Sequence, residues 1–399
     1  MKTVAIICEY NPLHSGHEYQ IKRIKEELGG ARIVAVMSTE FVQRGDVAVF
    51  PRGVRAEAAL EAGCDLVLEL PFPYSYSSAE YFARAGVYIA DAIGVCDTLS
   101  FGSELGDVEF LKSCADRLRD DKFVAEVEKY QESNKSIGHI KARFDVANSI
   151  YGKEFAEAMS SPNNILALEY IKAARELGSE LDFHTVLREG DGYNDVSGEG
   201  KFVSATYLRE LIADGKKIYD FVPRGCAELY KKAIQSGAVA DIKRIESAVL
   251  AYFRLADACD LSDFAEMSDG LEYRLCECAS AATSLDEFFS LAATKKYTNA
   301  RIRRAVISSL LKVREADIKA LPAYTSVLSS NKTGLDILKE MKKSSRIPVI
   351  TKPADYKNRS DEVKSAFEKA EKAYAFYSLS QKAPASADEF MKFTPIITN

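Results

Sequence analysis

Two of the four histidines of this 399-residue chain lie close together near its N-terminus, in the stretch NPLHSGH that ends at residue 17. His14 and His17 are three positions apart with Gly16 between them, and a short apolar run precedes them. At the start of a helix, both imidazoles would lie on one side of the first turn and could donate hydrogen bonds to one phosphoryl group. The free backbone N–H groups of a helix N-terminus also attract a phosphate. The spacing therefore predicts a nucleotide-activating site.

Two other interpretations of these histidines are a capping turn with two surface imidazoles and a zinc site. The helix of a zinc metalloprotease needs a glutamate beside the first histidine and ligands one full turn apart, whereas Ser15 and Gly16 follow His14 here. Elsewhere only Cys276 and Cys278 are closely spaced, and no second pair or histidine follows them at finger spacing. The sequence predicts no metal site.

The elements that must position the histidines alternate between two patterns. Short runs rich in β-branched residues predict buried strands at residues 3–8, 32–38, 65–70, 97–101 and 181–187. Segments of helical period predict helices at residues 14–28, 52–62, 77–93 and 164–177. Such alternation indicates an α/β fold, a Rossmann-like parallel sheet with helices on both faces, whose ligand binds beyond the carboxyl ends of the strands. The histidines lie at that edge of the sheet.

The second half of the chain has a different pattern. Strand-like runs disappear after about residue 215, and long amphipathic stretches follow at residues 241–257, 285–293, 299–313, 333–343 and 361–380. Residues 346–362 contain Pro348 and Pro353 and predict an extended excursion before the last helix. We therefore expect two domains, residues 1–215 with the parallel sheet and residues 216–399 mainly helical.

Composition bounds the class of protein. Hydrophobic residues make up 47% of the chain and charged residues 28%, and no run approaches the roughly 18 apolar residues that cross a bilayer. The apolar segment at the N-terminus is too short for a signal peptide, so we expect a cytoplasmic protein and no membrane contact. The eight cysteines are scattered through apolar segments, as in a reducing compartment. A net charge of −6 excludes a generally basic surface but leaves room for a local basic patch.

One such patch is predicted at residues 295–312. Ile302, Val306 and Leu310 share one helical face, so the basic residues of the segment point elsewhere with no acid among them. These residues are Lys295, Lys296, Arg301, Arg303 and Arg304. An RNA backbone is a suitable partner, and a merely solvated face is the alternative.

The motif NPLHSGH resembles the H-x-G-H signature of the nucleotidyltransferase superfamily. Further stretches make the resemblance more specific: residues 9–17, 41–50, 55–83, 101–104, 161–170 and 204–211. Together they resemble the tRNA(Met) cytidine acetate ligase family over residues 1 to about 350. The resemblance implies an enzyme that uses ATP and acetate, through acetyl-adenylate, to acetylate N4 of the wobble cytidine in elongator tRNA(Met). It implies a nucleotidyltransferase domain at residues 1–215, a tRNA-binding domain at residues 216–399 and no obligate protein partner.

The same resemblance implies roles for individual residues. His14 and His17 would be catalytic, and the basic patch at residues 295–304 would bind tRNA. The expected ATP-binding residues are Ile7, Cys8, Glu9, Tyr10, Asn11, Pro12, Leu13, His14, Ser15, Gly16, His17, Gly102, Asn163, Arg188, Glu189, Ser204 and Thr206. Mg²⁺ would accompany ATP, held mainly by phosphates and water.

Each of these residues also has a plainer role. Asn11 could be only a turn residue, Gly102 a turn glycine and Asn163 a helix cap, while Arg188 could be solvated. Ser204 and Thr206 are ordinary N-caps, although with Arg209 one turn later they occupy the place of the superfamily's second phosphate-binding signature.

The chain departs from the family pattern at two places. Ser38-Thr39-Glu40 stands where relatives have Ser-Gly-Asn, and Pro51-Arg52-Gly53 where they have Asp-Lys-Trp. A lost glycine and an added acid near phosphates would weaken ATP binding, and Arg52 would replace the charge of the missing lysine. Two alternative functions stay open: an adenylyltransferase for a small phosphorylated metabolite, and a catalytically impaired nucleotide-binding protein.

Overall fold

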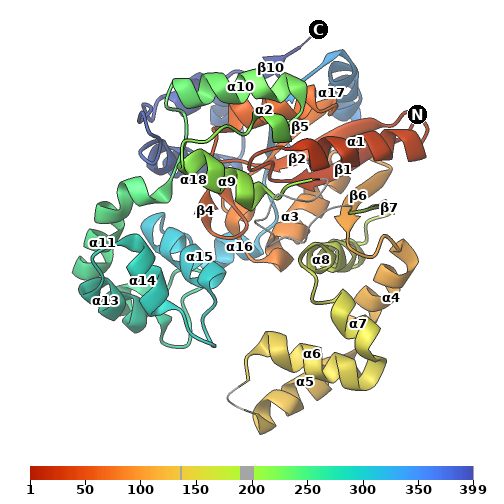
Figure 1. Ribbon diagram of the computed structural model, residues 1–399. Coiled ribbons are helices and arrows are strands. Elements are labelled where there is room, and N and C mark those ends of the chain that lie inside the picture. The colour runs from red at the N-terminus through yellow and green to blue at the C-terminus, as the bar shows by residue number, and fades with distance from the viewer. Residues whose placement is uncertain (135–136, 189–201, 399) are drawn as a thin grey trace.

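The computed structural model describes residues 1–134, 137–188 and 202–398. Within them, the central sheet has eight strands, in the order β10-β8-β5-β2-β1-β6-β7 with β9 paired to β8 (Figure 1). The strands are β1 (Thr3–Cys8), β2 (Arg32–Ser38), β5 (Leu66–Leu70), β6 (Thr98–Ser103), β7 (Asp182–Leu187), β8 (Thr325–Ser330), β9 (Val349–Ile350) and β10 (Ile396–Ile397). Strands β5, β2, β1, β6 and β7 are mutually parallel, as predicted, and β8 is antiparallel to β5.

Helices cover both faces of the sheet. Neighbouring residues of each strand point to opposite faces, so each strand contributes side chains to the hydrophobic clusters on both sides. In β1, Ala5 and Ile7 pack into one hydrophobic cluster, with helices on that face, and Val4 and Ile6 pack into another. The helices of the first face are α3 (Ala79–Ala92), α8 (Pro162–Leu177) and α17 (Lys332–Ser344). Those of the second face are α1 (Ser15–Glu27), α2 (Arg52–Glu61), α9 (Ala205–Ala213) and α10 (Arg224–Gln235). The predicted Rossmann-like α/β class is confirmed.

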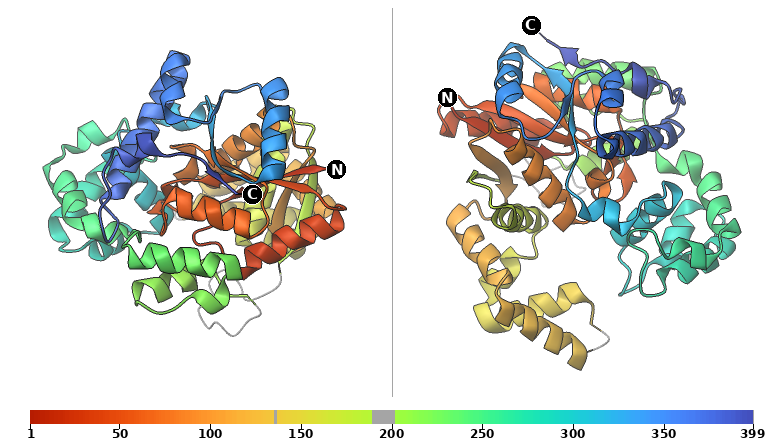
Figure 2. Two further views of the ribbon diagram at one scale, coloured as in Figure 1. Left: turned by 90° about the horizontal axis from the view of Figure 1, so that it is seen from above. Right: turned by 180° about the vertical axis from the view of Figure 1, so that it is seen from behind.

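Four helices between β6 and α8 form an arm that projects from the sheet-containing body (Figure 1). They are α4 (Val108–Leu118), α5 (Asp121–Ser133), α6 (His139–Tyr151) and α7 (Lys153–Ala158). Figure 2 shows the same projection from behind. No motif in the sequence pointed to this arm.

A helical lobe follows α10 and packs around its own hydrophobic cluster. Its helices are α11 (Glu246–Leu255), α12 (Ala258–Leu261), α13 (Leu271–Ala281), α14 (Leu285–Ala292), α15 (Asn299–Leu310) and α16 (Glu315–Lys319). Two further helices close the chain, α18 (Asp361–Ser378) and α19 (Glu389–Lys392), while 3-10 turns occupy Tyr74–Tyr76, Tyr219–Phe221, Ile242–Ile245 and Pro353–Asn358. The mainly helical character of the second half is as expected.

The expectation that strands end near residue 215 is wrong. After the helical lobe, β8 and β10 return to the central sheet beside β5. The sequence of β8, TSVLSS, is half serine, and so polar a segment does not indicate a buried strand. Two of its serines are nevertheless buried and bonded, since Ser329 Oγ donates to the Ala56 carbonyl at 2.8 Å and Ser330 Oγ donates to the Asn331 carbonyl at 3.0 Å.

A small hairpin lies outside the sheet. Strands β3 (Phe41–Val42) and β4 (Asp46–Val47) pair antiparallel, directly after the carboxyl end of β2. Gly45 at its tip has φ +75°, and a Cβ there would lie 2.6 Å from the backbone nitrogen of Arg304 in α15. The hairpin therefore lies against the backbone of the helical lobe at the edge of the sheet where ligands are expected.

Candidate active site at the carboxyl edge of the sheet

The two histidines cap the first helix with their own side chains. His14 is the N-cap of α1, one residue before the helix begins, and its Nδ1 accepts a hydrogen bond from the Gly16 N–H at 3.1 Å. The Nδ1 of His17 accepts from the His14 N–H at 3.2 Å, which completes a reciprocal capping box. A Cβ on Gly16 would lie 3.0 Å from the His14 ring, so a glycine lets that ring fold back onto the helix end.

Both imidazoles are neutral at physiological pH. Burial, with smaller effects of Arg188 and Arg209, lowers the pKa of His14 to about 3. Burial, the neighbouring His14 and Arg188 lower the pKa of His17 well below its ordinary value. Because each Nδ1 accepts a backbone N–H, each neutral ring carries its proton on Nε2. The pair therefore offers two fixed Nε2–H donors, with ring centroids 3.9 Å apart.

The turn before the histidines is fastened from several sides. The Asn11 side chain accepts from the Val49 N–H at 2.7 Å, and the Asn11 carbonyl accepts from Arg209 at 2.8 Å. The Tyr230 hydroxyl donates to the Leu13 carbonyl at 3.2 Å. The side-chain oxygen of Asn11 therefore has a structural role, because it holds the turn to residue 49.

The second helix N-terminus lies beside the first. Ser204 is the N-cap of α9, and its Oγ accepts from the Tyr207 N–H at 3.2 Å. Arg209 of the same helix donates to Thr206 Oγ1 at 3.0 Å as well as to the Asn11 carbonyl. The guanidinium of Arg209 thus joins the beginnings of α1 and α9, so the two predicted phosphate-binding sites are adjacent.

A third group of residues closes the site from β6 and α8. Arg188 donates to the Asn163 side-chain oxygen at 3.0 Å, and the stem of Arg188 lies 3.3 Å from where a Cβ on Gly102 would be. Asn163 does not cap α8, because Ser161 is the N-cap residue. Since Arg188 lowers the pKa of both histidines, it lies near them. Glu189, also expected at the nucleotide, lies outside the described residues.

Two residues of this edge had no predicted role. Glu104 accepts hydrogen bonds from the backbone N–H groups of Asn163 and Asn164, at 3.1 and 3.0 Å, and so occupies the start of α8. Fully buried Arg55 donates to the carbonyls of Glu9 at 2.6 Å and Ser38 at 2.9 Å, which fixes the ends of β1 and β2. The sequence does contain a sign that Arg55 is buried. Arg55 lies four residues before Ala59 and therefore on the buried alanine face of α2.

The two departures from the family pattern contact each other. Arg52 Nε donates to Glu40 Oε1 at 2.6 Å, and both side chains are buried. A third buried group, Glu69, lies 3.7 Å from the Arg52 guanidinium, and burial raises the pKa of Glu69. The Arg52 guanidinium also lies 4.5 Å from the centre of the Phe390 ring. The added acid is therefore neutralised by the added base.

The arginines of α15 are engaged by acids from distant parts of the sequence. Arg304 pairs with Glu266, and Arg303 pairs with Asp46 at 3.1 Å. Arg301 pairs with Asp269 at 3.4 Å, and Lys296 donates to the carbonyl of the same residue at 3.0 Å. Lys295 is exposed and has no hydrogen-bond or ion-pair partner among the described residues. Residues 295–304 contain no acidic residue, but the fold places three acidic side chains against them, Asp46, Glu266 and Asp269.

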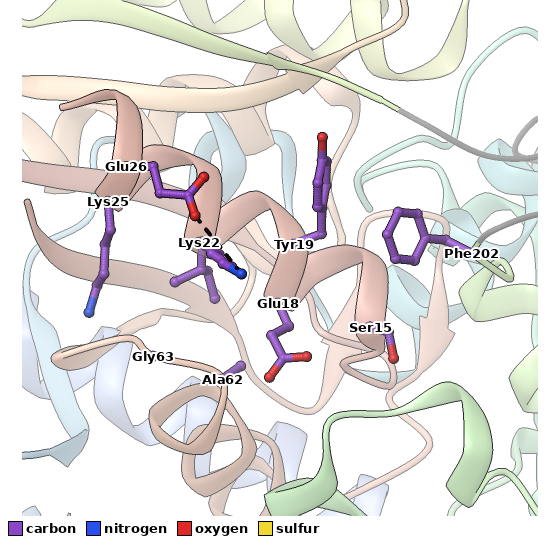
Figure 3. Close-up of a pocket in the computed structure, with 10 residues that line it drawn as sticks. Ser15, Glu18, Tyr19, Lys22, Lys25, Glu26, Ala62, Gly63 and Phe202 are labelled. Atoms are coloured by element: carbon purple, nitrogen blue, oxygen red, sulfur yellow. Dashed lines mark ion pairs between the residues drawn. The ribbon is translucent and has the colours of Figure 1, made fainter. Parts of the chain in front are cut away.

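A separate groove of about 680 Å³ lies along α1 (Figure 3). It is lined by Ser15, Glu18, Tyr19, Ile21, Lys22, Lys25, Glu26, Ala62, Gly63 and Phe202. Neither histidine lines it, and its charged side chains have both signs. Of the expected ATP-binding residues that the structure describes, Ser15 alone lines this groove, so the groove lies beside the site built by the two helix N-termini.

Two structural observations concern metals and membranes. Among the described residues, no group of three or more His, Cys, Asp and Glu side chains is arranged to hold a metal ion. Every helix in the described part of the chain is too short or too polar to span a bilayer.

Comparison with known proteins adds a family and relatives. Residues 1–390 match the model of the family described as HIGH Nucleotidyl Transferase. A tRNA(Met) cytidine acetate ligase from Caldanaerobacter subterraneus subsp. tengcongensis is 34% identical over 387 residues, 96% of each protein. One from Acetivibrio thermocellus is 32% identical over 414 residues, 99% of each.

Solved structures agree with these relatives. The apo crystal structure of Thermotoga maritima TmcAL is 29% identical and superposes with a TM-score of 0.93, covering 100% of both chains. The structure of TmcAL bound with alpha-thio ATP superposes with a TM-score of 0.91 and the same coverage.

Proposed function

This chain belongs to the HIGH nucleotidyl transferase family and, within it, to the tRNA(Met) cytidine acetate ligases, and we propose that it acetylates tRNA with ATP and acetate. The enzyme activates acetate as acetyl-adenylate. It then transfers the acetyl group to N4 of the wobble cytidine of elongator tRNA(Met), forming N4-acetylcytidine. It works in the cytoplasm, without an obligate protein partner.

The observation that carries the proposal is the neutral histidine pair at the start of α1. Attack of acetate on the α-phosphate builds negative charge on the phosphoryl oxygens, so the reaction needs fixed donors aimed at that charge. The Nε2–H groups of His14 and His17 supply such donors, and their low pKa values keep the donor count constant near neutral pH. Arg209, which joins α1 to α9, and Arg188 add positive charge beside them.

The reaction has two steps. An acetate oxygen bonds to the α-phosphorus, and the bond to the leaving pyrophosphate breaks. The cytidine amine then bonds to the acetyl carbon, the bond to the AMP oxygen breaks, and the amine loses one proton. Positioning and electrostatic stabilisation are the protein's contribution to the first step.

We assign the residues as follows. His14 and His17 are catalytic, and ATP binds the turn and helix start at residues 7–17 together with Gly102, Asn163, Arg188, Glu189, Ser204 and Thr206. Residues 1–215 carry the catalytic site, with the nucleotide at the sheet edge, and the helical lobe within residues 216–399 binds tRNA through α15 and Lys295. ATP enters with Mg²⁺, which phosphate oxygens and water hold.

The test supplies the protein with ATP, labelled acetate and an unmodified elongator tRNA(Met) transcript. We expect pyrophosphate release that depends on acetate, and label at the wobble cytidine. A transcript with uridine at the wobble position is the matched control and should take up no label. Pyrophosphate release that needs a phosphorylated metabolite instead would indicate an adenylyltransferase, and no release with any substrate would indicate an impaired nucleotide-binding protein.

A further inference from the structure

Glu9 lies between the histidine turn and the helical lobe. It directly follows β1, and its partly buried carboxylate accepts a hydrogen bond through Oε1 from the Gln43 N–H at 2.7 Å. Gln43 belongs to the β3–β4 hairpin. The carboxylate therefore points from the nucleotide turn toward the hairpin.

The hairpin connects this carboxylate with α15. The Gly45 Cα lies so close to α15 that a Cβ would be 2.8 Å from the Arg303 side chain, and Asp46 pairs with Arg303 at 3.1 Å. A tRNA held on α15 would thus approach the nucleotide past the hairpin, on the side toward which Glu9 points. The acceptor amine would then reach the acetyl group from that side.

Several groups face Glu9. Arg209 of α9, Arg55 of α2 and Arg44 of the hairpin lie near its carboxylate, as do the Cys8 thiol and the Tyr170 hydroxyl of α8. Burial outweighs the three guanidinium groups and raises the pKa of Glu9 above its ordinary value. A carboxylate with a raised pKa is a better proton acceptor near neutral pH.

Other carboxylates of this edge are already engaged. Glu40 pairs with Arg52, Asp46 pairs with Arg303, and Glu104 accepts from the start of α8. Among the described residues, Gln43 is the sole hydrogen-bond donor to Glu9, which leaves Oε2 able to accept a proton.

We propose that Glu9 is the catalytic base of the transfer step, a role that rests on the proposed function. As the cytidine N4 bonds to the acetyl carbon, the carbon–oxygen bond to AMP breaks and its electron pair leaves with AMP. Oε2 of Glu9 takes the proton that N4 loses and later releases it to water. Glu9 serves the acceptor side of the site, while the histidines serve the phosphate side.

The experiment separates the two steps in the full-length protein. Acetate-dependent exchange of pyrophosphate into ATP measures the first step, and single-turnover label transfer to tRNA measures the second. Because the carboxylate of Glu9 points toward the hairpin and only its backbone belongs to the nucleotide turn, we expect Glu9→Gln to lower the transfer rate by about 10² to 10⁴ and the exchange rate by less than about threefold. The wild-type transfer rate should rise with pH through the raised pKa of Glu9, and this dependence should be absent in Glu9→Gln.

Two further variants complete the design. Glu9→Asp keeps a carboxylate and should transfer faster than Glu9→Gln. Glu18→Gln makes the same substitution on α1, in the separate groove, and should match wild type in both steps. Transfer by Glu9→Gln at the wild-type rate, or an equal loss of exchange and transfer, overturns the role of Glu9. Absence of acetate-dependent exchange in the wild-type protein overturns the proposed function itself.

Discussion

The start of α1 and the start of α15 both gather cationic or potentially cationic side chains, but they treat charge in opposite ways. At α1, burial lowers the pKa of His14 to about 3, so its ring works as a neutral dipole. At α15, Arg303 pairs with Asp46 and Arg304 pairs with Glu266. The first region offers fixed neutral donors, the kind of group that stabilises charge developing during a reaction. The second has most of its charge compensated before any partner arrives.

This difference in charge pairing determines how readily each region can bind an anion. A phosphate that meets the histidines gains two donors and displaces no ion pair, because each Nδ1 is bonded to the backbone. An RNA phosphate that meets Arg303 or Arg304 must compete with a carboxylate already in place. On the proposed function, recruitment of RNA by this lobe would depend on exposed Lys295 more than on the paired arginines.

Among the changes that test this comparison, His17→Ala has the largest expected effect. Removal of one fixed donor at a developing charge typically costs on the order of 10² to 10³ in rate. We expect a loss of that size in acetate-dependent pyrophosphate exchange. His17→Gln keeps a side-chain donor and should lose less. If His17→Ala exchanged at close to the wild-type rate, the neutral pair would not be the phosphate-activating group.

Arg304→Met tests the compensated charge of α15. Arg304 is 8% exposed, and its removal leaves Glu266 partly buried without its shorter ion pair. We expect a loss of about 2 kcal/mol in the free energy of unfolding, measured by urea denaturation, with pyrophosphate exchange retained. A double variant with Arg304→Met and Glu266→Gln should lose less free energy of unfolding than the sum of the losses in the two single variants. Strict additivity would mean that the pair contributes no coupling.

These two regions also differ in how far the sequence predicts them. The histidine site follows from residues within four positions of one another, so strand, turn and helix periodicity suffice to place it. The partners of the α15 arginines, at residues 46, 266 and 269, lie far along the chain, and periodicity carries no information about them. Arg52 and Glu40 each depart from the family pattern in the sequence, but only the fold shows that they form an ion pair.

Strands were predictable to the extent that their composition marked them. The five parallel strands of the first half match the prediction, whereas β8, in which three of six residues are serine, was not predicted. The arm of α4 to α7 was missed because its helices interrupt the crossover from β6 to β7 without a motif. Tertiary contacts, which a single sequence does not display, decide such features.

The pH dependence of stability sharpens the account of the neutral histidines. An unfolded histidine binds a proton near pH 6.5 and folded His14 near pH 3, so unfolding takes up a proton between these values. Stability contributed by neutral His14 is complete above pH 6.5 and falls as the pH is lowered. Between pH 6.5 and 5 the loss is about 2 kcal/mol.

His14→Asn isolates this contribution, because asparagine caps a helix and does not titrate. When the pH falls from 6.5 to 5, the free energy of unfolding of wild type should fall by about 2 kcal/mol more than that of this variant. Urea denaturation of both proteins at both pH values measures the difference. An unchanged difference would mean that His14 titrates normally in the folded protein and is charged at acid pH.

The smallest expected effect belongs to Lys295→Ala, and it decides whether α15 and its flank bind RNA through free or through compensated charge. Exposed Lys295 has no described partner, so its removal should leave the free energy of unfolding unchanged. Affinity for tRNA should fall about fivefold, roughly 1 kcal/mol, and the slope of log affinity against log salt should become shallower by about 0.9. Lys319→Ala, whose lysine already pairs with Glu315, is the matched control and should bind tRNA as wild type does. An unchanged salt slope in Lys295→Ala, together with a reduced slope in Arg303→Ala, would reverse the comparison: the paired arginines would then exchange their acids for RNA phosphates.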